Sequence, residues 1–266
     1  MPPADGTDKE VALAGGMGSG GAVVRVGDTV RRPVGPFTPA VRALLGHFER
    51  VGFRGAPRWR GTDDRGRDVL DFVDGDVGIP PYPPWTADDD LVVSVATLQR
   101  DAHRAARDFR PPESAAWQDT MVPDALRGTL VCHNDLCVGN VVVRDGRAVA
   151  FIDWDFAAPV DPLLDIAIAA RHWVPLRDAT DLDESRADVD RIARFGTICD
   201  VHELPRPQRV ELVDAALAFL DQALASMRSR AQSGLPHYVA AWDAGYEGQN
   251  RRSHAWVLAE RAALTR

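Results

Sequence analysis

Three polar residues in the middle of the chain are spaced as a metal-dependent phosphoryl-transfer site requires. In the stretch "HNDLCVGNVVVRDGRAVAFID", Asp135 is followed by Asn140 five residues later and by Asp153 after a further thirteen. Phosphoryl transfer needs a carboxylate that orients and deprotonates the acceptor hydroxyl, together with oxygen ligands for Mg²⁺ held in fixed positions. The spacing therefore favours Asp135 as the base and Asn140 and Asp153 as the metal ligands.

The residues around this triplet predict how it is positioned. "NVVVRDGRAVAFID" alternates around Asp145-Gly146, and Asp-Gly between β-branched runs is a strong hairpin signal. Asn140 then precedes one strand and Asp153 ends the next, which places their oxygens near the same rim of the hairpin. Hard oxygen donors of this kind suit Mg²⁺.

The longer segment "VCHNDLCVGNVVVRDGRAVAFIDWDFAAPVDPLLDIA" resembles the catalytic core of the aminoglycoside phosphotransferase and choline kinase group, distant relatives of protein kinases. The resemblance implies an α/β (α+β) protein-kinase-like fold with a small β-rich N-terminal lobe and a mainly helical C-terminal lobe. It implies that Asp135 is the catalytic base, that Asn140 and Asp153 bind Mg²⁺, and that His133 and Asp165 brace the catalytic loop. It also implies ATP or GTP as co-substrate. The alternative is a polar turn that joins a hairpin to the core.

The N-terminal segment is expected to bind the nucleotide. "VALAGGMGSGGAVVRVGDTVRRP" predicts a strand, a glycine-rich turn over residues 15–21, a second strand, a turn at Gly27-Asp28 and a third strand that ends at Pro33. A glycine-rich turn lets backbone N–H groups approach phosphates closely. The candidate phosphate-binding residues in it are Gly16, Gly18, Ser19 and Gly20. The alternative for this turn is a flexible connector.

The usual phosphate-binding lysine of kinases is absent. Lys9 is the only lysine, so 30 of the 31 basic residues are arginines, and Lys9 precedes the first plausible strand. Kinases hold the α- and β-phosphates with a strand lysine that pairs with a helix glutamate. Arg31 and Arg32 of the third strand point to opposite faces, and the resemblance of "TVRRP" to the family's strand ending favours Arg31.

A helix is expected over residues 38–51, where the apolar residues recur at helical spacing. Its early positions hold no glutamate, and Glu49, near its end, is interpreted as a solvated charge. The ion-pair partner therefore stays unassigned. Further on, two strands joined at residues 64–66 lead to Leu70–Val73. This segment is expected to form the hinge, where Asp71 and Val73 offer backbone groups to adenine, or else an ordinary edge strand.

The proline cluster "GIPPYPPW" after Asp74-Gly75 marks a linker. We therefore expect residues 1–10 to be disordered, 11–75 to form the N-terminal nucleotide-binding lobe, and 76–266 to form the C-terminal catalytic and substrate-binding lobe. Helices are predicted in this second lobe over residues 88–109, the segment "DPLLDIAIAARHWV", 188–199, 206–230, 236–246 and 248–264.

Only a few residues separate Asp155 from Asp161-Pro162, which leaves little room for a peptide-docking platform and favours a small-molecule acceptor. The acidic residues of the C-terminal region are candidates for binding it. They are Asp178, Asp181, Asp183, Glu184, Asp243 and Glu247. The alternative, which charge runs usually favour, is a solvated helix face and loop.

Composition limits the partners and the compartment. The 266-residue chain is 45% hydrophobic and carries a net charge of −8, which argues against nucleic acid as a partner and tolerates a cationic one. It has no apolar signal region at its N-terminus and no run of about 18 apolar residues. Cys132, Cys137 and Cys199 form no paired framework, as expected in a reducing compartment. We therefore expect a cytoplasmic protein without membrane contact.

The spacing of Cys132, Cys137 and His133 leaves a zinc site as one hypothesis. Small buried thiols are favoured, because a second Cys/His pair at ligand spacing is missing.

The function predicted is the ATP- or GTP- and Mg²⁺-dependent transfer of phosphate to a hydroxyl of a small molecule, an aminoglycoside-type antibiotic or an endogenous alcohol, amino alcohol or sugar. The alternative is a pseudokinase-like nucleotide-binding regulator without catalysis, which the missing lysine motivates.

Overall fold

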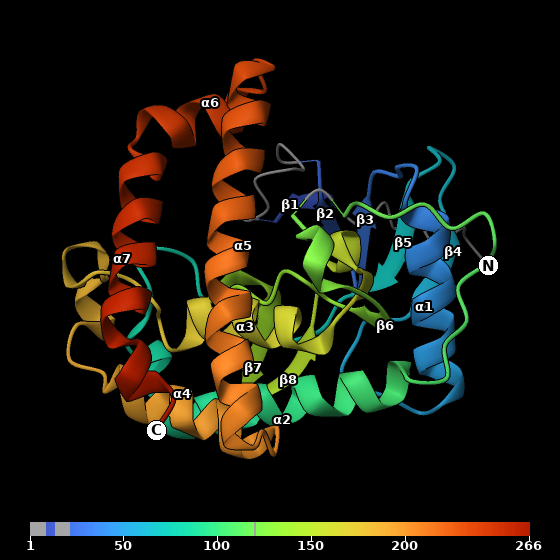
Figure 1. Ribbon diagram of the computed structural model, residues 1–266. Helices are drawn as coiled ribbons and strands as arrows, with labels where there is room; N and C mark the ends of the chain where they lie inside the picture. The colour runs from blue at the N-terminus through green and yellow to red at the C-terminus, as the bar shows by residue number, and fades with distance from the viewer. Residues whose placement is uncertain (1–8, 14–21, 120) are drawn as a thin grey trace, which may run out of the picture.

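The computed structural model describes residues 9–13, 22–119 and 121–266 of the chain. Their arrangement is mixed α+β, with a β-rich N-terminal sheet followed by a mainly helical C-terminal part, as the sequence predicts (Figure 1). The candidate phosphate-binding residues Gly16, Gly18, Ser19 and Gly20 lie outside the described residues, and so do residues 1–8 of the segment expected to be disordered.

The N-terminal sheet is antiparallel, with strand order β1-β2-β3-β5-β4. Its strands are β1 (Val11–Ala12), β2 (Val24–Val26), β3 (Thr29–Arg32), β4 (Trp59–Thr62) and β5 (Asp68–Asp71). β2 and β3 form the predicted hairpin, in which Gly27 takes a positive φ of 59° that a glycine adopts without steric cost. β5 lies between β3 and β4, so the edge-strand interpretation of Leu70–Val73 is wrong.

Helix α1 (Thr38–Arg50) covers this sheet and joins it to the rest of the molecule (Figure 1). It begins with a proline in its first turn, where the missing N–H costs nothing. Its predicted apolar stripe is buried and consists of Val41, Leu44, Leu45 and Phe48. Burial of side chains of this size contributes roughly 1.5–3 kcal/mol each, so the stripe anchors α1.

The C-terminal part begins with helix α2 (Asp89–Ala106), whose N-terminus is capped by the Asp88 carboxylate. Two strand pairs follow: β6 (Arg127–Cys132) pairs with β9 (Ala158–Val160), and β7 (Val141–Arg144) pairs with β8 (Arg147–Phe151). Asp145 and Gly146 take left-handed φ values of 51° and 71° in the turn between β7 and β8, as a two-residue hairpin turn requires.

The remaining α-helices follow the predicted stretches with small shifts of their ends. They are α3 (Pro162–Trp173), α4 (Arg191–Val201), α5 (Arg206–Gln232), α6 (Pro236–Asp243) and α7 (Tyr246–Leu264). In Figure 1, α5 and α7 run side by side and α6 joins their upper ends. No helix in the described part of the chain is both long and apolar enough to cross a membrane.

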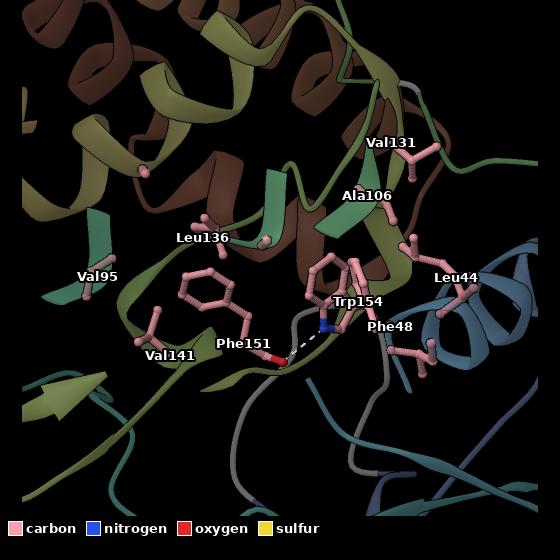
Figure 2. Close-up of a cluster of buried hydrophobic side chains, with 14 of the residues drawn as sticks. Leu44, Phe48, Val95, Ala106, Val131, Leu136, Val141, Phe151 and Trp154 are labelled. Carbon is pink, nitrogen blue, oxygen red and sulfur yellow. Dashed lines mark hydrogen bonds between the residues drawn. The ribbon is translucent and has the colours of Figure 1, made fainter. Parts of the chain in front are cut away.

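The largest apolar core connects α1 to the segment that carries the candidate site (Figure 2). Phe48 of α1 packs edge-to-face on Trp154, with ring centroids 5.1 Å apart. Trp154 donates its indole N–H to the Phe151 carbonyl at 2.9 Å, the dashed line in Figure 2. Leu136 is fully buried in the same core. This packing fixes the residues next to Asp135 and Asp153 against the N-terminal helix.

Candidate active site

The candidate catalytic loop, residues 133–140, connects β6 to β7. His133 is buried and links the loop to the end of β8, because its Nε2–H donates to the Ile152 carbonyl at 2.9 Å. Its Nδ1 accepts the Asp135 N–H at 3.2 Å. Burial lowers the pKa of His133, so the ring is neutral at pH 7 and holds Asp135 through a fixed tautomer. His133 thus connects the end of β8 to the backbone of Asp135.

Asp165 supports the loop from α3. Its carboxylate is 1% exposed, and Oδ1 accepts the Asn134 N–H at 2.6 Å. Oδ2 accepts hydrogen bonds from Gln99 and His103, each at 2.7 Å. Burial alone would raise the pKa of Asp165, but the hydrogen bond and the charge of His103, together with the hydrogen bond from Gln99, outweigh it and lower the pKa. Asp165 is therefore an ionised anchor.

Asn134 and Asp153 both adopt left-handed backbone conformations, with φ values of 60° and 61°. Residues other than glycine rarely adopt this region, and it persists where the surroundings fix it. Around Asn134 these surroundings are the Asp165 carboxylate and the Cys132, Phe156 and Ala158 carbonyls, which accept from the Asn134 amide. The loop and the end of β8 thus hold their conformations by polar contacts as well as packing.

Asp135 and Asn140 are in direct contact. The Asn140 Nδ2 group donates to the Asp135 backbone carbonyl and to Asp135 Oδ2, both at 2.8 Å. Burial, followed by the charge of Asp153, raises the pKa of Asp135 to about 8, against the hydrogen bond from Asn140 and the charge of Arg171. A carboxylate with a pKa near the working pH is suited to act as a general base.

The oxygen donors of Asn140 and Asp153 fit a divalent cation such as Mg²⁺. The Asn140 side-chain nitrogen donates to Asp135, which leaves the Asn140 Oδ1 atom as an acceptor. No described residue donates a hydrogen bond to Asn140 Oδ1 or to Asp153 Oδ2. The Ile152 N–H donates to the Asn140 carbonyl at 2.9 Å, which ties the start of β7 to the end of β8. Few hard oxygen ligands of this kind match the preference of Mg²⁺.

The structure places Arg32, rather than the favoured Arg31, at this site. Arg32 donates to Asp153 Oδ1 at 3.1 Å and also to Asp155. Arg31 donates to Thr29 at 2.5 Å and pairs with Asp63 at 3.7 Å. The two side chains alternate across β3, as expected. Arg32 is the one on the face of Asp153, whereas the resemblance favoured Arg31.

Two residues at this site were not anticipated from the sequence. Arg42 of α1 pairs with Asp68 of β5 through Nε at 2.8 Å and Nη2 at 2.6 Å, and Asp68 lies opposite Arg32 in the sheet register. Arg42, Asp68 and Arg32 line one recess with Asp153 and Asp155. The helix therefore contributes a cation and the strand contributes the acid. The sequence of α1 does not indicate the Arg42–Asp68 ion pair, because Asp68 lies on β5 and not at helical spacing from Arg42.

Glu49 behaves as expected of a surface charge. It is 47% exposed in its side chain and pairs with Arg58 at 2.9 Å.

Burial raises the pKa of Asp155 to about 7, although the charge of Arg32 lowers it, and the charge of Asp153 raises it further. Asp155 is thus a second acidic group beside Asp153.

The expected adenine-binding segment is only partly available. The Asp71 N–H donates to the Arg58 carbonyl at 2.9 Å inside the sheet, and the Asp71 carboxylate binds Arg60. The Asp71 N–H therefore cannot bind adenine. Val73 follows the end of β5, and its backbone groups make no hydrogen bond with the described residues. Val73 stays a candidate for adenine recognition.

Three of the six acids proposed to bind the acceptor are engaged by arginines. Asp181 binds Arg252 through two hydrogen bonds of 2.8 and 2.6 Å. Asp183 accepts from Arg186 at 2.5 Å. Glu247 accepts from Arg228 at 3.0 Å and from Arg251 at 2.8 Å. Glu184 and Asp243 are exposed, and Asp178 caps the short helix that follows it. These acids are spread over separate elements instead of one negative pocket.

The three cysteines are free, and Cys132 and Cys199 are buried. Within the described residues, the group that could hold a metal ion brings Cys132 together with His103 and Asp165, not with His133 and Cys137. Since Asp165 already accepts from His103, Gln99 and Asn134, this group is accounted for by the support of the catalytic loop. Burial raises the pKa of Cys137 to about 12, as expected of an inert thiol.

Comparisons with known proteins point to one family. A model of the phosphotransferase enzyme family matches residues 73–196, which include the whole candidate catalytic loop. The trifolitoxin immunity protein of Rhizobium leguminosarum bv. trifolii is 30% identical over 268 residues, covering 96% of this chain and 97% of that protein.

Two solved structures share the fold. A choline/ethanolamine kinase family protein from Mesorhizobium loti has a TM-score of 0.63 at 15% identity, covering 98% of this chain and 94% of its own. An aminoglycoside phosphotransferase from Alicyclobacillus acidocaldarius has a TM-score of 0.52 at 17% identity, covering 91% and 89%. At these identities the likeness establishes the protein-kinase-like fold predicted from the sequence, and no more than the fold.

Proposed function

This chain belongs to the phosphotransferase enzyme family, and we propose that it transfers the γ-phosphate of ATP or GTP to a hydroxyl of a small molecule in a Mg²⁺-dependent reaction. The observation that carries the proposal is the Asp135–Asn140 contact beside Asp153. Asn140 fixes the Asp135 carboxylate at 2.8 Å and keeps its own oxygen free for a cation. A protein that only binds nucleotide has no need of a positioned base.

The residues have separate roles in the proposed reaction. Asp135 accepts the proton of the acceptor hydroxyl as that oxygen attacks phosphorus, and His133 and Asp165 keep its loop in place. Asn140 and Asp153 are the residues that would hold Mg²⁺, which supplies charge neutralisation for the phosphates when bound. Arg32 replaces the missing lysine, since its planar guanidinium is always charged and can bind a phosphate oxygen from the same face of the sheet.

The expected two-lobed organisation also enters the proposal. The β-rich segment of residues 11–75 would hold the nucleotide, with Val73 at the adenine, and residues 76–266 would supply catalysis and acceptor binding. Asp161 N-caps α3 through the Leu163 N–H at 2.9 Å, so the chain returns to a helix soon after Asp155. This short connection supports a small-molecule acceptor in place of a docked peptide.

A direct experiment separates catalysis from binding. The purified chain would be titrated with ATP and GTP, with and without Mg²⁺, in a thermal-shift assay, and then screened for ATP-dependent phosphorylation of hydroxylated small molecules. We expect Mg²⁺-dependent stabilisation by at least one nucleotide and transfer to at least one acceptor. Nucleotide binding without transfer to any acceptor, and without hydrolysis, would favour the pseudokinase-like alternative.

The name of the 30% identical relative supports a second candidate, protection of a cell against a toxic compound. The two candidates coincide when the compound is itself the phosphate acceptor. Expression of the chain and of Asp135→Asn in a trifolitoxin-sensitive strain would separate them. Protection by both forms indicates immunity by binding alone, and protection by only the wild type indicates immunity by phosphorylation.

A further inference from the structure

Three arginines form a cluster around His172, at the end of α3. Arg171 lies in the last turn of α3, Arg177 follows that helix, and Arg186 ends the short helix η6 (Glu184–Arg186). The Nε atom of each is inaccessible to solvent and has no hydrogen-bond partner. Arg171 and Arg177 make no side-chain hydrogen bond or carboxylate contact with any described residue. Buried polar groups of this kind are normally satisfied.

Arg186 and Tyr82 bring the cluster to the catalytic loop from one side. The Arg186 guanidinium stacks on the Tyr82 ring, 4.1 Å from its centroid, and the Arg186 side chain is 3% exposed. Tyr82 follows a segment that packs on the loop, because the Gly78 N–H donates to the Val138 carbonyl at 3.4 Å. A Cβ atom at Gly78 would lie 2.4 Å from the Val138 side chain, so the two segments are in close contact.

The end of α3 brings the cluster to the same loop through a second contact. The Trp173 indole donates to the Leu136 carbonyl at 3.1 Å, next to Asp135. Arg186 Nη1 donates to the His172 carbonyl at 2.9 Å. Arg171 therefore lies two residues from a direct contact with the loop, and its positive charge lowers the pKa of Asp135 against the larger effect of burial.

The cluster has an excess of positive charge. Asp183 accepts from Arg186 at 2.5 Å, and it is the only acid among the described residues that forms a salt bridge with these three arginines. Burial, followed by the charge of Arg171, lowers the pKa of Arg177. Burial and the charges of all three arginines lower the pKa of His172, which is therefore neutral. Arg171 and Arg177 are half-buried, so their charge without a carboxylate partner carries a desolvation cost, and a bound anion would reduce that cost.

We propose that the phosphate acceptor carries an oxyanion, a phosphate, sulfate or carboxylate group, which Arg171, Arg177 and Arg186 bind so that its hydroxyl lies at Asp135. This rests on the proposed function, and it departs from the cationic partner that the net charge of −8 would tolerate. Guanidinium groups match planar and tetrahedral oxyanions by paired hydrogen bonds. A cationic amino alcohol or aminoglycoside would meet like charges here.

The first test uses inorganic sulfate and phosphate as probes in a thermal-shift titration without nucleotide, with chloride at equal ionic strength as reference. The variant is Arg171→Gln/Arg177→Gln. The control, Arg228→Gln/Arg251→Gln, removes two exposed arginines that share Glu247. We expect both probes to stabilise wild type and control, with at least tenfold weaker binding to the variant. No preference over chloride, or an equal response in the variant, overturns the anion site.

Stability without the probes distinguishes a binding role from a structural one. Because Arg171 and Arg177 are half-buried and have no carboxylate partner among the described residues, the variant is expected to melt at or above the wild-type temperature in chloride buffer. A clear loss of stability would mean that these arginines hold the fold and would contradict the proposal. Arg171→Lys/Arg177→Lys keeps both charges and is expected to retain part of the affinity for sulfate.

Two further measurements separate the acceptor from the nucleotide. We expect the Arg171→Gln/Arg177→Gln variant to bind ATP with Mg²⁺ within twofold of wild type, and a parallel loss of ATP affinity would assign the arginines to the nucleotide phosphates instead. In a phosphorylation screen, hydroxy acids and sugar phosphates should be accepted before amino alcohols. Activity confined to cationic or neutral acceptors overturns the proposal. Since the sulfate titration needs no turnover, its outcome is independent of whether the chain is a kinase.

Discussion

Arg32 on β3 donates a hydrogen bond of 3.1 Å to Asp153, a residue 121 positions further along the chain. The contact joins the N-terminal sheet to the end of β8, beside the candidate catalytic loop. Both side chains are mostly withdrawn from solvent, with exposures of 14% for Arg32 and 34% for Asp153. Arg32 is therefore placed to orient the candidate metal ligand and to attract phosphate to the same position.

The first prediction follows from this contact. Arg32→Ala should raise the KM for ATP about tenfold or more, since charge-assisted hydrogen bonds contribute about 1.5–3 kcal/mol and 1.4 kcal/mol is tenfold in affinity. Arg31→Ala, one residue away on the opposite face and paired with Asp63, is the matched control and should leave the KM nearly unchanged. Steady-state kinetics with both variants tests this. A large effect from Arg31 with none from Arg32 would return the role to Arg31.

The second prediction concerns the metal ligands. Asp153→Ala should abolish the Mg²⁺-dependent part of the stabilisation by ATP, and Asn140→Ala should weaken it, because only Asp153 contributes a negative charge. Thermal shifts measured with ATP, with and without Mg²⁺, give this difference directly. An unchanged Mg²⁺ dependence in both variants would remove these residues from the metal site.

The third prediction concerns the support of the loop. Asp165→Ala should destabilise the protein by about 3–5 kcal/mol, the range for breaking a buried charged pair, because Asn134, Gln99 and His103 all lose their acceptor. Urea denaturation gives the free energy of unfolding. His103→Ala removes one of these donors and should cost less. Equal stability of Asp165→Ala and wild type would show that the network does not hold the loop.

The fourth prediction concerns pH. Burial raises the folded-state pKa of Asp135 from 3.8 to about 8, so the stability associated with its protonated form is present below pH 4 and lost as the pH rises toward 8. Asp135→Asn removes this loss. In metal-free buffer, the melting temperature of the variant relative to wild type should therefore rise between pH 4 and 8 and level off above. A difference that stays constant over this range would contradict the raised pKa.

Local sequence signals were sufficient for the elements that carry the site. Asp145-Gly146 predicts the β7–β8 hairpin because the turn itself demands left-handed backbone, and both residues have it. The apolar stripe of α1 and the capping carboxylate of Asp161 before α3 are also local. These features depend on residues a few positions apart, which a single sequence displays.

Contacts between distant elements could not be read in the same way. Alternation on β3 leaves two possible phases, and only the packing of the sheet against Asp153 and Asp155 selects Arg32. The acids considered for acceptor binding gave no sign of their arginine partners, because Asp181 and Arg252 are 71 residues apart. The cluster of Arg171, Arg177 and Arg186 has no periodicity, and becomes visible only once the loops fold together.

The role of Asp135 as the general base is tested most directly by the rate of phosphate transfer by Asp135→Asn compared with wild type. The rate is measured with an acceptor from the screen, and the affinity for ATP is determined in parallel. Asn keeps the shape of the side chain and removes the proton acceptor. We expect unchanged binding of ATP with Mg²⁺ and a turnover lower by about 10²–10⁴, the usual range for loss of a positioned general base. Transfer at the wild-type rate would contradict this role of Asp135.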